Sequence, residues 1–232
     1  MSFTVVQAGL ASFLLGLSTL FSIVNPIGAS LIFAQVTAAR SHAERLELAR
    51  RISIYAAMIM LAALWAGTPI LSFFGVSLGA LRIAGGLVVA ASAWSLLTAP
   101  EAREARKQAE AEPEGADRAR DRLAEIAFFP LTLPFTTGPG TIAVAIALGA
   151  NRPPPGPDRI GFYVGVSLAA LAIAGTVRLF YGSADRVVSL IGPVRARVLG
   201  RLFAFLLLCV GTQITVNGIS DVLRPLLTAR AT

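Results

Sequence analysis

The stretches Asn25-Pro26-Ile27-Gly28 and Thr137-Gly138-Pro139-Gly140-Thr141 each place a proline-glycine break inside an apolar segment long enough to cross a bilayer. A bilayer offers no water to backbone groups that a helix break sets free, so such breaks persist only where protein or a water-filled cavity surrounds them. Matching breaks in the two halves of a chain are typical of transporters. The two stretches therefore predict a membrane protein with an internal binding site.

The composition independently indicates a membrane protein. The chain has 232 residues, of which 55% are hydrophobic and 14% are charged, and its mean hydropathy is +0.72. These values are typical of a polytopic membrane protein. Runs such as 52–65 are apolar on every face and lack the alternation of a β-barrel, so we expect an all-α integral membrane protein. Six transmembrane helices are predicted, at 9–37, 52–73, 76–97, 126–149, 160–181 and 201–223.

The basic residues indicate how the chain is oriented. A net charge of +7 could suggest nucleic acid as a partner, so their distribution decides the question. With the N-terminus outside, most of them fall in the inner loops, namely Arg40, Arg45, Arg50, Arg51, Arg103, Arg106, Lys107, Arg118, Arg120, Arg122, Arg186, Arg195, Arg197 and Arg201. The outer segments hold only Arg152, Arg159, Arg224 and Arg230. The positive-inside rule then predicts periplasmic termini, and membrane lipids rather than nucleic acid as the partner of the inner arginines.

A charged segment, 98–125, divides the chain into two repeats of three spans each, 1–97 and 126–232. We expect this segment to be a cytoplasmic linker within one membrane domain. Span two aligns with span five at an offset of 108, which matches Arg51-Ile52 with Arg159-Ile160 and Gly67-Thr68 with Gly175-Thr176. Because each half has an odd number of spans, the second half enters from the opposite side. The predicted architecture is a 3+3 inverted repeat with discontinuous helices 1 and 4.

The breaks also supply candidate ligands for a solute. Proline has no N–H, so carbonyls upstream of each break lose their partners and suit an ammonium group or a cation. The half-helices that follow offer free N–H groups and a positive dipole end, which suit a carboxylate. A small zwitterion fits both ends, although prolines can also merely kink packed helices. The candidate substrate-binding residues are Asn25, Pro26, Gly28, Thr136, Thr137, Gly138, Pro139, Gly140 and Thr141.

Arg82 is a further candidate, because a charge inside a predicted span is costly and usually faces the protein interior or a cavity. Two interpretations stay open for this residue. Its guanidinium binds a substrate carboxylate, or its long stem carries the charge to the nearby outer surface.

Several chemistries are not expected. Cys209 is the only cysteine and His42 the only histidine, so the sequence predicts no metal site and no cofactor. It has neither a phosphate-binding glycine loop nor a Ser-His or Cys-His pair within the spans, so we expect no enzyme activity. No Asp or Glu lies in the middle of a predicted span, which leaves a proton and a sodium ion as alternative coupling ions.

Glycine-rich helix faces predict close helix contacts. Gly75 and Gly79 form one such face, and Gly161 and Gly165 form another. Small residues let helices approach closely, but the pattern does not distinguish contacts within one chain from contacts in a homo-oligomer.

Three motifs, taken in their order along the chain, resemble the MarC family of bacterial inner-membrane proteins, and the resemblance covers nearly the whole chain. They are Phe21-Ser22-Ile23-Val24-Asn25-Pro26-Ile27-Gly28, Leu81-Arg82-Ile83-Ala84-Gly85-Gly86, and Pro130-Leu131-Thr132-Leu133-Pro134-Phe135-Thr136-Thr137-Gly138-Pro139-Gly140-Thr141. The resemblance implies a LysE-like transporter fold, a bacterial inner-membrane location and a role like that of the family's transporters of glycine and alanine. It does not imply antibiotic export. The long charged linker and the proline-rich turn at 151–157 depart from the family pattern, outside the motifs.

Two functions therefore remain open. The first is a secondary transporter or exporter of small neutral amino acids that works by alternating access. The second is a non-transporting membrane scaffold or assembly protein, whose basic cytoplasmic loops bind lipid or a partner.

Overall fold

The computed structural model describes residues 3–37, 40–98 and 123–228. Within these residues the regular secondary structure is helical. The elements are α1 (Phe3–Val24), α2 (Pro26–Val36), α3 (His42–Phe73), α4 (Leu78–Thr98), η1 (Ala127–Thr136), α7 (Pro139–Ala150), α8 (Pro157–Gly182), α9 (Ala184–Ile191) and α10 (Pro193–Thr228). Most of the predicted linker 98–125 lies outside the described residues.

Five segments of the described chain are long and apolar enough to cross a membrane, by length and composition. They are Val5–Ala34, which contains the break at Asn25, and then His42–Phe73, Leu78–Ser95, Pro157–Gly182 and Val198–Leu223. They agree with five of the six predicted spans. The described part of the chain is thus all-helical and has several segments that could span a membrane.

The remaining predicted span, 126–149, is not one helix. It consists of η1 and α7, which are 10 and 12 residues long, and each is too short to span a bilayer alone. Inside η1 the backbone is extended at Phe129 (φ −128°, ψ 122°) and Leu133 (φ −109°, ψ 124°). Both residues precede a proline, which disfavours helical dihedrals in the residue before it. The segment is therefore interrupted at Pro130 and Pro134 as well as at the predicted break.

Helix α3 begins ten residues before the predicted span because polar residues extend it. Ser41 and Glu44 form a capping box, in which the Ser41 hydroxyl accepts from the Glu44 N–H and the Glu44 carboxylate accepts from the Ser41 N–H. Glu47 then pairs with Arg50 and Arg51 one turn further on.

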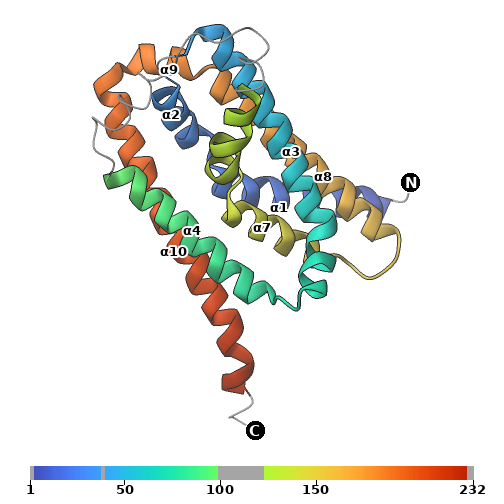
Figure 1. Cartoon of the computed structure of the whole chain (residues 1–232). Helices are drawn as coiled ribbons and strands as arrows, with labels where there is room; N and C mark the ends of the chain where they lie inside the picture. Colours follow the sequence, from blue (N-terminus) through green and yellow to red (C-terminus); the bar gives the residue numbers. More distant parts are fainter. Residues whose placement is uncertain (1–2, 38–39, 99–122, 229–232) are drawn as a thin grey trace.

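The helices connect two ends of the molecule (Figure 1). One end, here called the α9 end, comprises residues 40–45 and 182–193, where Asp185 pairs with His42 and Arg45. The other, here called the Asn151 end, comprises residues 73–78 and 150–157. Helices α3 and α10 run from the α9 end toward the Asn151 end, whereas α4 and α8 run the opposite way.

Two helix pairs are packed through glycine within the chain. In the pair α4 and α10, a Cβ placed on Gly86 would lie 2.6 Å from the carbonyl oxygen of Gly211, and one on Gly218 would lie 2.8 Å from that of Gly79. In the pair α1 and α8, a Cβ on Gly161 would lie 2.5 Å from a carbonyl oxygen of α1. These backbones could not approach so closely with larger residues. In Figure 1 the pair α4 and α10 lies along one side of the other helices.

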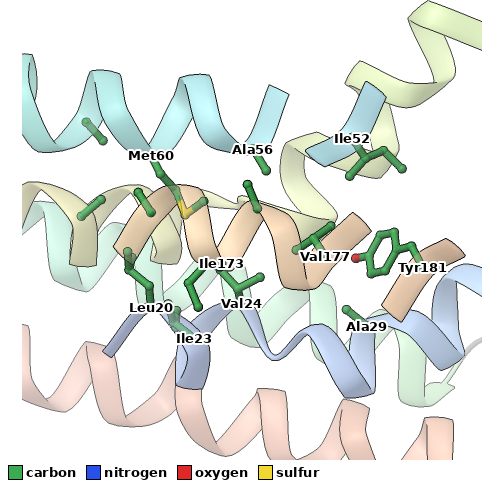
Figure 2. Close-up of a cluster of buried hydrophobic side chains, with 14 of the residues drawn as sticks. Leu20, Ile23, Val24, Ala29, Ile52, Ala56, Met60, Ile173, Val177 and Tyr181 are labelled. Carbon is green, nitrogen blue, oxygen red and sulfur yellow. The ribbon is translucent and has the colours of Figure 1, made fainter. Parts of the chain in front are cut away.

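The buried core lies among the remaining helices. Figure 2 shows side chains of α1, α2, α3 and α8 converging, with Met60 of α3 and Ile173 of α8 near its centre. Leu20, Met60 and Ile173 are completely buried. This core holds α1 and α2 in place on both sides of the break at Asn25.

Candidate functional site at the helix breaks

Asn25 forms the first break through its own backbone and side chain. It adopts a left-handed conformation (φ 44°), which Asn tolerates better than most residues. Its N–H still donates to the carbonyl of Phe21 at 2.9 Å, and its side-chain oxygen accepts from the Gly28 N–H at 3.2 Å. Asn25 therefore ends α1 and caps α2, whose first residue is Pro26. The Asn25 side-chain N–H groups are not used by this cap.

The second break lacks such a cap. Gly138 precedes α7 with an extended backbone, and Pro139 is the first helical residue. No side chain caps this helix start. The first N–H groups of a helix have no partner within it, so those of Gly140 and Thr141 remain available. The α7 start is thus the less satisfied of the two breaks and the better site for an anionic group.

A cavity of about 50 Å³ lies between the two breaks. Six predicted site residues line it, namely Asn25, Gly28, Thr136, Gly138, Pro139 and Thr141. The residues from α4 and α10 that close it include Val88, Val89, Ser92, Phe203 and Leu207. A cavity of this size has room for a few waters or one small solute.

Thr141 offers this cavity an unused polar group. The residue is 97% buried, since only 3% of its surface is exposed. Its hydroxyl makes no hydrogen bond to any other described residue. Because Thr141 lines the cavity, its hydroxyl is available to a solute or a water there.

Other threonines of the fourth segment have structural partners. The hydroxyls of Thr132 and Thr136 donate to carbonyls five residues earlier, at 2.6 and 2.7 Å. The Thr136 hydroxyl also bonds the Tyr181 hydroxyl of α8 at 2.9 Å. The Thr137 hydroxyl donates to the Thr132 carbonyl at 3.3 Å, and Thr137 does not line the cavity. These bonds satisfy backbone groups that the irregular segment leaves free.

Arg82 lies in a different cavity, of about 570 Å³, toward the Asn151 end. Its guanidinium pairs with the carboxylate of Asp221 on α10. The polar side chains lining this second cavity also include Asn151, Asn217 and Ser220. The structure thus places Arg82 apart from the residues of the breaks.

A thin apolar layer separates the two cavities. A Cβ placed on Gly140 would lie within 3.7 Å of the side chains of Val89, Ile214 and Ile23. Ile23 and Val89 line the first cavity, and Ile214 lines the second. Each of these three side chains is at most 9% exposed. The first cavity extends from this layer toward the α9 end and the second toward the Asn151 end.

The predicted site residues are thus divided among three places. Pro26, Thr137 and Gly140 lie beside the first cavity without lining it, and Arg82 lines the second. Sequence reasoning did not identify Ser92, Phe203 or Tyr181, because each lies on a helix far along the chain from the breaks. The polarity of Ser92 within an apolar span was the only local signal for any of them.

The α9 end carries charge but lies outside the two cavities. Burial alone would raise the pKa of Asp185, but its hydrogen bond with His42 and the charge of Arg45 outweigh burial and bring this pKa below its ordinary value of 3.8. The ion pairs tie α9 to the start of α3. Among the described residues, no group of three or more His, Cys, Asp or Glu side chains could hold a metal ion.

The spans, the interrupted helices and the cavities between helices together define a multi-pass α-helical membrane protein. Comparison with known proteins identifies the family. Residues 10–223 match the family described as MarC family integral membrane protein, and the chain belongs to this family.

Relatives named inner membrane protein MarC include one from Citrobacter koseri, which is 33% identical over 219 residues, with 90% of this chain and 95% of the relative covered. The proteins of that name from Salmonella typhimurium and Escherichia coli SMS-3-5 are each 32% identical, with the same shares covered. No solved structure matches the chain.

Proposed function

We propose that this protein is a secondary transporter of small neutral amino acids such as glycine or alanine, and not an enzyme. The observation that carries the proposal is the pair of cavities beside the broken helices, which are separated from each other by the Ile23, Val89 and Ile214 layer. A carrier needs a central site that can be reached from either side in turn, and this arrangement supports such a mechanism.

The first cavity suits a zwitterion of a few heavy atoms. The uncapped N–H groups at the start of α7 and the hydroxyl of Thr141 would receive the carboxylate. Ile23 and Val24, the last residues of α1, line the cavity at the negative end of that helix, which suits the ammonium group. The Asn25 side-chain N–H groups add a further donor. The cavity volume of about 50 Å³ favours a substrate with a very small side chain.

The packing supports an inverted repeat of two three-span halves. Under such symmetry α3 corresponds to α8 and α4 to α10, and in each case the two helices pack against one another. Helix α2 packs on α8 and α10, as α7 packs on α3 and α4. The Asn151 end, with the termini, would then face the periplasm and the α9 end the cytoplasm.

Alternating access would follow from movement of α4 and α10 together. Both cavities lie between this glycine-packed pair and the helices of the breaks. A small tilt of the pair would widen one cavity while it narrows the other. The coupling ion would be a proton or sodium.

The test is counterflow of labelled glycine and alanine in proteoliposomes without an imposed ion gradient, because counterflow detects a carrier whatever its coupling ion. Thr141→Val and Thr137→Val are a matched pair, since both threonines are buried and only Thr141 lines the cavity. We expect Thr141→Val to raise the half-saturating concentration about tenfold, as expected for loss of one buried hydrogen bond. Thr137→Val should transport normally.

Equal loss in both threonine variants would refute the assignment of Thr141. Absence of counterflow in a folded wild-type protein, with glycine and alanine both inactive, would refute the transporter proposal and favour the scaffold function. Adding a pH gradient or a sodium gradient to active proteoliposomes would then identify the coupling ion.

A further inference from the structure

We propose that the second cavity is a separate binding site, in which the ion pair of Arg82 and Asp221 receives a free zwitterionic solute before it reaches the helix breaks. Arg82 and Asp221 both line this cavity. That its occupant is an amino acid rests on the proposed function.

The charges of this pair match a zwitterion at both ends. The Arg82 guanidinium is a fork of N–H donors that fits a carboxylate, and the Asp221 carboxylate accepts from an ammonium group. The two side chains come from α4 and α10, so one cavity wall presents both charges side by side. A solute with only one charge would satisfy one partner and leave the other without a counter-charge.

The pair is weak enough to be opened by a solute. The Arg82 side chain is 27% exposed and that of Asp221 is 40% exposed, so water screens their attraction. A zwitterion inserted between them would replace one ion pair with two, because its carboxylate would pair with Arg82 and its ammonium group with Asp221.

Neutral polar groups surround the two charges. Asn217 already receives a hydrogen bond on its side-chain oxygen from Gln213 at 2.9 Å, which leaves its amide N–H groups as donors. Asn151 lies across the cavity at the end of α7. With walls from α1, α4, α7 and α10, the cavity lies between helices, which favours a free solute over a lipid headgroup as its occupant.

The position of the cavity explains why a second site would exist. It lies on the Asn151 side of the Ile23, Val89 and Ile214 layer, which separates it from the first cavity. A solute bound to Arg82 and Asp221 would be separated from the breaks only by this apolar layer. Binding in this cavity would therefore select for zwitterions before the first cavity selects for size.

Cysteine labelling tests this site without requiring transport. Ser220, which lines the cavity, is changed to cysteine in a Cys209→Ser background, and its reaction with a membrane-impermeant maleimide is timed in purified protein. Asp158→Cys in the same background is the matched control, because Asp158 is exposed near the same end and does not line the cavity. The probes are glycine, acetate, methylamine and phosphoethanolamine.

We expect saturating glycine to slow labelling at Ser220→Cys at least threefold, with no effect at Asp158→Cys. Acetate and methylamine at the same concentration should have little effect. Adding Arg82→Gln or Asp221→Asn should abolish the protection, and the exchanged pair Arg82→Asp with Asp221→Arg should restore it. A purely structural ion pair would give no protection that depends on the charges of the solute.

Three results would overturn the proposal. They are equal protection by acetate or methylamine, protection by phosphoethanolamine but not by glycine, and an unreactive Ser220→Cys beside a reactive Asp158→Cys. Protection by glycine without counterflow would refute the proposed transport and leave this site standing. Counterflow without protection would refute this site alone.

Discussion

Replacing Asn25 with alanine should destabilise the protein by about 2 kcal/mol, and replacing it with glycine should cost only a few tenths. Alanine removes the side-chain oxygen that accepts from the Gly28 N–H at 3.2 Å. Loss of such a cap costs about 1 kcal/mol, and alanine tolerates the left-handed conformation at φ 44° less well than asparagine, whose side chain bonds the local backbone, which adds about 1 kcal/mol. Glycine also loses the cap, but without a Cβ it adopts this conformation more easily than asparagine or alanine.

The assay is thermal unfolding of the purified variants in one detergent at one scan rate. For a chain of this size 1 kcal/mol corresponds to about 2–4 °C in Tm, so we expect Asn25→Ala to lower Tm by about 4–8 °C and Asn25→Gly by about 1 °C. Asn25→Asp keeps the capping oxygen and should also stay near wild type. If the alanine variant were as stable as the glycine variant, the left-handed backbone at residue 25 would contribute nothing to the difference in stability, and this explanation would be refuted.

The same series separates folding from solute binding. Asn25→Asp retains the cap but loses the side-chain N–H groups that line the first cavity. We therefore expect it to be stable and to show reduced counterflow. Asn25→Ala is the poorer test of binding, because its instability alone would lower transport.

Three further predictions concern other parts of the fold. Gly149→Ala should strongly lower Tm, because its Cβ would overlap a backbone carbonyl of α3, whereas Gly175→Ala should be neutral or stabilising because a Cβ there meets nothing within 4 Å. Tyr181→Phe should cost about 1 kcal/mol, measured by the same unfolding assay, since it removes the buried bond to Thr136. Asp185 has a lowered pKa, so its contribution to stability is present above about pH 4 and is lost as the pH falls through the folded pKa. Asp185→Asn should therefore flatten the pH dependence of Tm below about pH 5, and an unchanged pH profile would contradict this.

The sequence predicts the helices well because their apolar runs are long and continuous. The break at Asn25 was also predictable, since Asn-Pro ends one helix and begins another by local chemistry alone. The same local rule, applied to Pro130 and Pro134, would have anticipated that η1 is irregular. The apolar composition of that segment predicted one span of sufficient length and gave no sign of the two additional interruptions at Pro130 and Pro134.

The cavities were less predictable because they depend on distant pairs. Nothing near Arg82 in the sequence indicates that Asp221, 139 residues further along the chain, is its partner. The glycine faces illustrate the same limit. Gly161 packs against α1, whereas Gly75 has a φ of +65°, and a Cβ added there would meet nothing within 4 Å. Identical residue types thus serve a helix contact in one place and a turn in the other.

The two breaks look equivalent in sequence, but their chemistry differs. The Asn25 side chain accepts from the Gly28 N–H of α2, whereas Gly138 has no side chain to cap α7. A carboxylate would therefore bind better at α7, and the end of α1 beside it suits an ammonium group. Under the proposed function, the two ends of a zwitterion would have different positions in the cavity, so the site would fix the orientation of the solute. An inverted repeat with two identical breaks would bind a zwitterion in two orientations, and the asparagine would remove that ambiguity.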